Sequence, residues 1–371
     1  MKAFEYADKY VTEREIAYTI PSMVIGVGIL TLPRLLAEAT NNSDGYISVF
    51  IAGMIAVVTT WLVAKLATRF PEQSFYSYTS QIVTKPISTI LTILVGVHFL
   101  LLTVYEIRMV GIIAKFYLFD TTPIEIICLV FFLIVIYAVS GIRVGILRLN
   151  MLFLPIILVI SSLIIIFNIG LMEGQNLYPF FKTSLGGYAK GIKESYFSFA
   201  GTGILLFYIQ FVKKPAKVPK HAAAFMLLPT FLYILIHMAC VLVFSYNVTS
   251  TMLFPTIELA KEVEIPGGFF ERFEALFFTI WIMAIFNTTA MAFDVSIMAF
   301  SSLLPKIKKF SWVLVLAPFT YICSMMPENF NAMSKFGEFI SYLGVVFSTA
   351  LPITLLVIAK LRGIKGNEED I

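Results

Sequence analysis

Two matched glycine motifs contain the residues best suited to bind a ligand. The first is Gly26-Val27-Gly28-Ile29-Leu30, inside an apolar run from about Ile16 to Leu36, and the second is Gly201-Thr202-Gly203-Ile204-Leu205. Each glycine costs about 1 kcal/mol in helix propensity relative to alanine, and Pro33 removes one more backbone donor. Paired interruptions in two halves of a chain are typical of transporter binding sites. We therefore expect both helices to open at these glycines, although close packing of helices is an alternative use of small residues.

An opened helix offers bare peptide groups of both kinds. Its freed N–H groups and positive dipole end favour a carboxylate, and its freed carbonyls favour an ammonium group. A small zwitterion satisfies both, so an amino acid is the expected ligand. The expected apolar wall of the pocket consists of Leu102, Met291, Phe199 and Ile25.

A second group of candidates lies on the third apolar run. His98, Leu102 and Glu106 are four residues apart and share one face of a helix. A carboxylate within a membrane span is costly and usually faces a cavity or a partner. We expect Glu106 to line the pocket or a polar path. Arg108 points to nearly the opposite face and is expected to extend to the outer surface.

The eighth apolar run carries a further polar stripe. Asn287, Met291 and Asp294 lie at i, i+4 and i+7, with Thr288 adjacent. Asn287 and Thr288 are expected near mid-depth, either as ligand contacts or as hydrogen-bonding groups between helices, and Asp294 nearer the cytoplasmic side. His237 is isolated, and we expect a satisfied packing role for it.

Other chemistries find no support in the sequence. Cys128, Cys240 and Cys323 are far apart in apolar runs and read as small buried side chains. No spacing indicates a metal site, a nucleophile–base pair, a phosphate loop or a nucleic-acid site, so we expect no enzyme activity and no cofactor. The basic cluster Lys213, Lys214, Lys217 and Lys220 favours a cytoplasmic loop that attracts anionic lipid.

The composition requires a bilayer around these elements. Of 371 residues, 59% are hydrophobic and 13% are charged, and runs of 18 or more apolar residues recur, which is typical of an all-α polytopic membrane protein. The start of the chain does not read as a cleaved signal peptide. We expect ten spans in one membrane domain, over residues 14–38, 45–68, 87–118, 123–141, 149–170, 194–212, 221–246, 270–303, 310–327 and 337–360.

Charge distribution predicts the orientation of these spans. With the N-terminus inside, 18 Lys and Arg residues fall in inner connections and 8 in outer ones, which places both termini in the cytoplasm. The interrupted helices are then the first and the sixth, of opposite orientation. This predicts a five-plus-five inverted repeat, with halves at about 12–170 and 190–361 and a tail at 362–371.

One connection has its own character. Residues 253–268 read as a short amphipathic outer helix that Pro266 and the following glycines stop. It is expected to be either a lid over the pocket or a docking surface for another protein.

Several motifs together resemble a known family. They are Gly26-Val-Gly-Ile-Leu-Thr-Leu-Pro33, Tyr105-Glu106-Ile-Arg108, Thr121-Thr-Pro123, Asn176-Leu-Tyr-Pro179, Phe199-Ala-Gly-Thr-Gly203, Pro255-Thr-Ile-Glu258, Pro266-Gly-Gly-Phe-Phe-Glu-Arg272 and Trp281-Ile282. The whole chain resembles the B subunit of bacterial spore germinant receptors, the GerAB/GerKB-like proteins. These belong to the amino acid–polyamine–organocation transporter superfamily.

The resemblance implies a germinant sensor in the spore inner membrane that works with A and C receptor subunits. It implies a ligand site between the broken first and sixth helices and the third and eighth. Gly26, Gly28, Gly201 and Gly203 would border the germinant, Leu102 and Thr288 would touch it, and Glu106 would line the polar path. The fifth span, from Met151 to Ile169, lacks the lysine that proton-coupled relatives often carry. A free-standing secondary amino acid transporter remains the alternative function, because it would need the same pocket.

Overall fold

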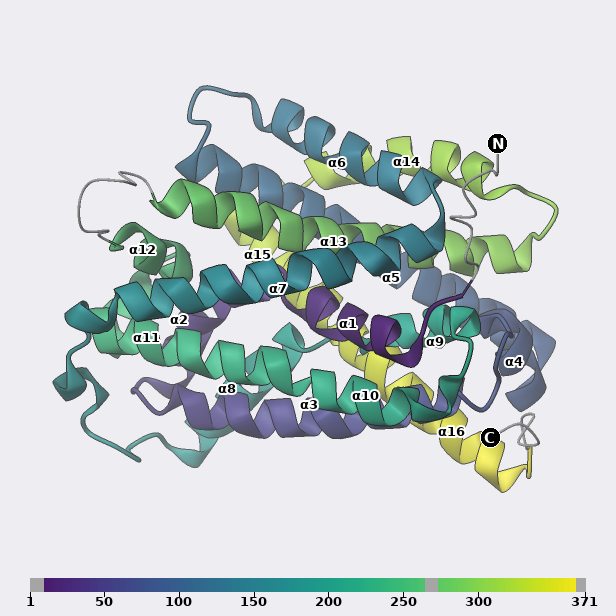
Figure 1. Cartoon of the computed structure of the whole chain (residues 1–371), viewed down its shortest axis with the longest axis horizontal. Helices are drawn as coiled ribbons and strands as arrows, with labels where there is room; N and C mark the ends of the chain where they lie inside the picture. Colours follow the sequence, from purple (N-terminus) through teal and green to yellow (C-terminus); the bar gives the residue numbers. More distant parts are fainter. Residues whose placement is uncertain (1–9, 264–272, 365–371) are drawn as a thin grey trace, which may run out of the picture.

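The protein is a bundle of long helices, and the first and last described segments of its chain lie at the same end of the bundle (Figure 1). The computed structural model describes residues 10–263 and 273–364. We call the end that holds these two segments the inner end, following the predicted orientation, and the opposite end the outer end. The helices are α1 (Glu13–Val24), α2 (Gly28–Thr40), α3 (Gly45–Ala67), α4 (Phe75–Ile82), α5 (Lys85–Tyr117), α6 (Ile124–Ser140), α7 (Arg143–Phe167), α8 (Leu185–Ser198), α9 (Leu205–Tyr208), α10 (Val218–Phe225), α11 (Leu227–Thr251), α12 (Pro255–Lys261), α13 (Phe273–Leu303), α14 (Lys309–Met325), α15 (Phe330–Val345) and α16 (Leu351–Leu361).

Membrane-spanning character is spread along the described chain. Six helical stretches in it are long and apolar enough to cross a bilayer, and the bent pair α1 and α2 makes a seventh. The apolar helices α6 and α14 are shorter. The number of ten spans and the boundaries of the two repeats stay predictions.

The first predicted helix break is confirmed. α1 begins with a capping box, in which Thr12 and Glu15 satisfy each other's backbone amides. It ends at Val24, and α2 starts at Gly28 after a bend of 52°. In a continuous helix the Gly26 amide would bond to Ser22, but here it donates to the Val24 carbonyl at 2.9 Å.

The second predicted break is confirmed as well. α8 ends at Ser198, and the chain resumes at Thr202 as a 3-10 turn that leads into α9. Gly201 has φ +139°, a conformation that side-chain-bearing residues rarely adopt. A Cβ there would lie 2.9 Å from Cγ of Met23, so the two breaks face each other.

Several boundaries differ from the predicted spans. The sixth span starts at Leu185 rather than at 194, because Ser184 caps α8 through a bond from Gly187 N and extends it over glycines and charges that lower its apolarity. The fifth starts at Arg143 rather than at 149, and the tenth at Phe330 rather than at 337. The predicted seventh span, 221–246, is divided between α10 and α11, and α4 lies in a predicted connection.

Arg108 does not extend to the surface, contrary to prediction. Its side chain is buried, and Nη2 donates to the Pro327 carbonyl at 2.8 Å. This carbonyl lies just beyond the C-terminus of α14, where a cation is favoured. The loop after α14 covers the arginine and supplies the acceptor that solvent would otherwise provide.

The predicted outer helix is present in shortened form. α12 runs from Pro255 to Lys261, and Pro266 and the glycines expected to stop it lie outside the described residues. Thr256 Oγ1 donates to the Ile29 carbonyl at 2.7 Å. That carbonyl is available because Pro33, four residues later, has no N–H. The proline in α2 therefore creates the acceptor that attaches α12.

A short backbone pairing links the inner ends of the two broken spans. Val11 N donates to the Phe211 carbonyl at 2.8 Å, and Lys213 N donates to the Val11 carbonyl at 3.1 Å. Val11 precedes α1, and Phe211 and Lys213 follow α9. The two inner half-helices are thus joined directly to each other.

Candidate functional site: the cavity between the two helix breaks

A cavity of about 510 Å³ lies between the two breaks. Its walls come from α1, α2, α5, α8, α15 and the two breaks, with one residue, Thr288, from α13. Glu38 and Ala39 lie near the outer end of α2 and Phe330 at the outer end of α15, and Met23, His98 and Gly344 lie deepest by their order along the helices. The cavity therefore extends from the outer end toward mid-depth.

Seven of the predicted site residues line this cavity: Gly26, Gly28, His98, Leu102, Glu106, Gly201 and Thr288. They come from four separate stretches of sequence. The structure thus brings together the two glycine motifs, the stripe on the third span and one polar residue of the eighth. Their contact with a ligand stays a prediction.

The other five predicted residues do not line it. Phe199 packs on Tyr233 with ring centroids 5.4 Å apart, and a Cβ at Gly203 would lie 2.7 Å from Ser348 Oγ. Met291 faces the amide of Asn150, with 3.5 Å between Sδ and Nδ2. Ile25 and Asn287 are buried elsewhere in the packing. Ile25 and Phe199 lie within the breaks, Gly203 follows the second break, and Asn287 and Met291 share α13 with Thr288, but none of the five lines the cavity.

The backbone of the first break is partly satisfied by side chains. Thr288 Oγ1 donates to the Ser22 carbonyl at 3.1 Å, and Tyr233 Oη donates to the Val24 carbonyl at 2.7 Å. Within the described chain, the amides of Val27, Gly28 and Ile29 donate to no protein acceptor. Three free amides at the start of α2 form a site for an anion.

The glycines of this break are required by close contacts. A Cβ at Gly26 would lie 3.2 Å from Thr288 Oγ1 and 3.5 Å from Glu106 Oε1. A Cβ at Gly28 would lie 3.2 Å from Ser198 Cβ. Glycine therefore allows the unwound backbone to approach both the carboxylate of α5 and the second broken span.

Glu106 is the buried charge of the cavity. Its side chain is 4% exposed, and Oε2 has no hydrogen-bond partner in the described chain. A buried carboxylate without a partner is costly. Its position against Gly26 leaves it ready to accept a hydrogen bond from a group in the cavity.

Sequence reasoning missed two features of the site. Arg34 lines the cavity six residues after Gly28 in α2, and its guanidinium lies 5.7 Å from the Phe330 ring centroid. The α15 wall was also missed, although its small residues Ser334, Gly337, Ser341 and Gly344 recur every three or four positions. That spacing on one helical face was the available signal.

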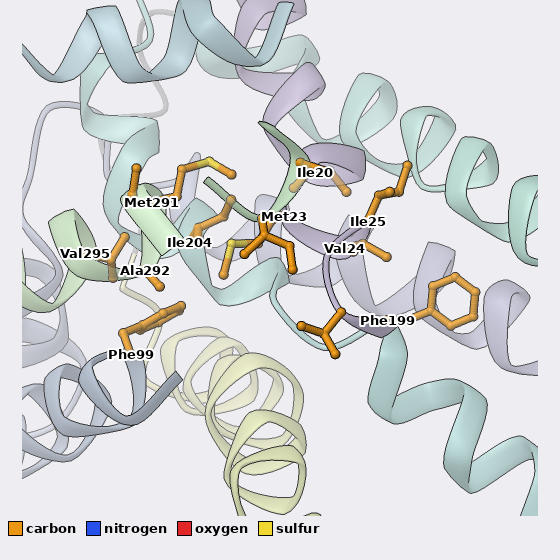
Figure 2. Packing of buried hydrophobic residues seen from close by; sticks show 14 of the residues in the cluster. Ile20, Met23, Val24, Ile25, Phe99, Phe199, Ile204, Met291, Ala292 and Val295 are labelled. Carbon is orange, nitrogen blue, oxygen red and sulfur yellow. The ribbon is translucent and has the colours of Figure 1, made fainter. Parts of the chain in front are cut away.

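The inner end of the cavity is closed by apolar side chains. Figure 2 shows Ile204, Met291 and Phe99 gathered near Met23, on the side away from Val24 and Ile25 of the first break. All four are at most 3% exposed. This apolar plug separates the cavity from the inner end of the bundle.

A cluster of charges lies beyond the plug. Asp294 is fully buried, and both of its oxygens lie 3.1 Å from Arg143 Nε. Lys309 Nζ is 3.4 Å away, and Tyr208 Oη donates at 3.3 Å. These groups join α13, α7, α14 and α9. We call Asp294, Arg143, Lys309 and Tyr208 the inner charge cluster.

No metal centre is evident in residues 10–263 and 273–364. No three His, Cys, Asp or Glu side chains there lie close enough to hold an ion. The cavity offers hydrogen-bonding and charged groups. It is suited to bind a small molecule.

The fold defines the class of protein. The structure is similar to that of MhsT in complex with L-phenylalanine, with a TM-score of 0.67 and 14% identity over 96% of this chain and 90% of that chain. It is also similar to Mhp1, a nucleobase-cation-symport-1 family transporter in a closed conformation, with a TM-score of 0.62 and 14% identity over 96% and 94%. The predicted LeuT-like fold class is confirmed, and the fold is that of membrane transporters.

Sequence comparison then gives the family. The family model of spore germination proteins matches residues 10–333. Spore germination protein GerLB of Bacillus cereus is 40% identical over 371 residues, covering 100% of this chain and 99% of GerLB. YndE of Bacillus subtilis (strain 168) is 32% identical over 352 residues, covering 95% and 97%. The chain belongs to the spore germination protein family, which confirms the resemblance seen in the sequence.

Proposed function

We propose that this protein is the germinant-binding B subunit of a spore germinant receptor. Its cavity binds a small zwitterion, an amino acid, and ligand binding shifts the helices around the two breaks. The observation that carries the proposal is one cavity with an unpartnered buried carboxylate, Glu106, beside the free amides of Val27 and Gly28 at the start of α2. Opposite charges on a small ligand match these two groups.

The ligand is oriented by the first break. Its carboxylate accepts from the amides of Val27 and Gly28, where the dipole of α2 favours an anion. Its ammonium donates to Glu106, which lies against Gly26. Both contacts involve the unwound part of the first span, so occupancy changes the equilibrium between arrangements that differ there.

The remaining parts of the proposal concern location and partners. We place the protein in the spore inner membrane with both chain ends in the cytoplasm, so that the cavity opens away from the spore core. A and C receptor subunits receive the shift in helix arrangement. The family and the charge bias of the predicted connections support this placement.

A secondary amino acid transporter is the second candidate function. It is supported by the similarity to MhsT, whose solved structure is a complex with L-phenylalanine. Both functions need ligand binding, but only a transporter moves solute when isolated. The receptor alternative predicts binding without uptake.

The test uses the full chain in nanodiscs and in proteoliposomes. Thermal shift and calorimetry are measured against amino acids, sugars and nucleosides, and uptake of the best radiolabelled ligand is measured in proteoliposomes. Amino acid binding without concentrative uptake supports the receptor subunit. Concentrative uptake would establish the transporter instead, and binding restricted to sugars or nucleosides would refute the zwitterion site.

A further inference from the structure

The deepest part of the cavity contains one polar side chain, although an apolar wall was expected. Of the four residues predicted to form an apolar wall, only Leu102 lines the cavity. The deepest lining residues are Met23, His98, Gly201 and Gly344. The imidazole of His98 is the one group among these four with side-chain hydrogen-bonding atoms.

His98 lacks protein partners in the described chain. The residue is 3% exposed, and Nδ1 is buried with no hydrogen-bond partner. Its ring packs against Phe99 and Phe347, with centroids 5.1 and 5.7 Å away. A Cβ at Gly344 would lie 3.7 Å from Cε1 and 4.0 Å from Nε2, so glycine leaves that edge of the ring open. Since buried polar groups are nearly always hydrogen-bonded, a ligand group is the natural partner.

The spacing along α5 sets the length of that ligand. His98 lies eight residues before Glu106, which is about 12 Å along a helix. Both side chains lean toward the start of the helix, so their tips keep a similar separation. A hydrogen bond of about 2.9 Å at each end leaves roughly 6 Å for the ligand. This matches the span from an α-ammonium group to the end of a glutamine or asparagine side chain, and a methyl side chain is too short.

The charge distribution limits the side chain to a neutral one. The charged residues of the cavity are Glu106, Arg34, Glu38, Lys190, Lys193, Glu194 and Glu338, and by their order along the helices all of them lie nearer the outer end than His98 does. None lies at the level of His98. An acidic or basic side chain reaching this level would be buried without a counter-ion. An amide both donates and accepts, as a neutral imidazole does.

We infer that the ligand of this cavity is an amino acid with a neutral amide side chain, and that His98 is the residue that selects it. The inference rests on the proposed function for the placement of the ammonium and carboxylate groups. It replaces the small or apolar side chain that the sequence favoured with a polar one of defined length.

The test compares amino acids of matched shape. Calorimetry on the full chain in nanodiscs measures asparagine against leucine and glutamine against methionine. We expect the amide member of at least one pair to bind about tenfold or more tightly, because the apolar member leaves the imidazole unpaired. Equal binding within both pairs, or tighter binding of leucine or methionine, overturns the inference while leaving amino acid binding intact.

Two variants of His98 identify the selecting group. His98→Leu is expected to remove the preference within each pair, whereas His98→Gln, which keeps a donor and an acceptor, retains it. His237→Leu is the matched control, since His237 is equally buried but lies outside the cavity lining. A preference that survives in His98→Leu, or that His237→Leu also removes, refutes the role of His98. Binding of no amino acid by the parent chain refutes the proposed function itself.

Discussion

At the scale of single residues, Glu106 and the glycines opposite it depend on one another. The carboxylate can lie within reach of the unwound backbone only because position 26 has no side chain. The backbone in turn gives the carboxylate a polar neighbourhood in the middle of a bilayer, where a charge is otherwise costly. Substitutions on either side of this contact should therefore affect binding first.

Replacement of Glu106 by glutamine should weaken every zwitterionic ligand. The charge-assisted hydrogen bond to the ammonium is lost, which corresponds to about 1.5–3 kcal/mol, or roughly ten- to hundredfold in affinity. The order of preference among amino acids should remain, because the side chain of the ligand points away from Glu106. Calorimetry on the variant would contradict this view if affinity were unchanged or the order of ligands reversed.

Replacement of Gly26 by leucine should abolish binding while the protein still accumulates. A side chain there would meet Thr288 and Glu106 and occupy the space of the ligand. Gly145→Leu is the control, because no heavy atom lies within 4 Å of a Cβ at that position. Thermal shift with the best ligand, and the germination dose-response of spores carrying each variant, measure the effect. A normal dose-response in Gly26→Leu would refute the site.

At the scale of helices, the molecule couples its outer and inner parts through specific bonds. Pro33 frees the Ile29 carbonyl, and the Thr256 hydroxyl of α12 donates a hydrogen bond to it. Beyond the apolar plug, the carboxylate of Asp294 in α13 contacts groups from three other helices, α7, α14 and α9. These contacts hold the arrangement in which the cavity extends toward the outer end.

Thr256→Val should loosen the attachment of α12 to α2. The Ile29 carbonyl would lose its donor in a buried position, at a cost of about 1–3 kcal/mol. We expect a lower Tm in detergent or nanodiscs, and Thr256→Ser, which keeps the hydroxyl, should restore most of it. Equal Tm values for the valine and serine variants would show that the hydroxyl contributes nothing.

Asp294→Asn should weaken closure at the inner end. Arg143 and Lys309 would then face a neutral amide, and these half-buried cations would lose their counter-ion. A cysteine introduced at Ile204, within the plug, should become reactive toward an impermeant maleimide added from the inner side. Asp120→Asn, an exposed outer carboxylate, is the matched control. An unreactive cysteine in the Asp294 variant would argue that the cluster does not close the bundle.

The sequence predicted the breaks well because they depend on local chemistry. Two glycines and a proline in an apolar run have few other uses at mid-depth. The start of α8 could not be predicted in the same way. Its glycines and charged residues lower the hydropathy of this segment, although the structure shows it to be helical. Asn287 and Met291 share a helix with Thr288, but the rotation of α13 about its axis is set by packing against α5 and α7. Which face meets the cavity was therefore not readable from spacing alone.

At the scale of the whole molecule, the cavity extends toward the outer end of the bundle, whereas the first and last described segments of the chain lie at the inner end (Figure 1). Ser334 lines the cavity on α15. A cysteine at this position should react with an impermeant reagent from the side opposite to a C-terminal tag, and a bound ligand should protect it. Labelling from the same side as the tag would contradict the proposed orientation of the cavity.

The pairing of Val11 with Val212 links two segments that are 201 positions apart in sequence. If the inner part of the first span tilts at its break, the inner part of the sixth span must move with it, because the two backbones are hydrogen-bonded at the inner end. Binding of a molecule in the cavity would then displace the inner parts of both broken spans together, and the inner end of the bundle would move as one unit rather than as two independent parts.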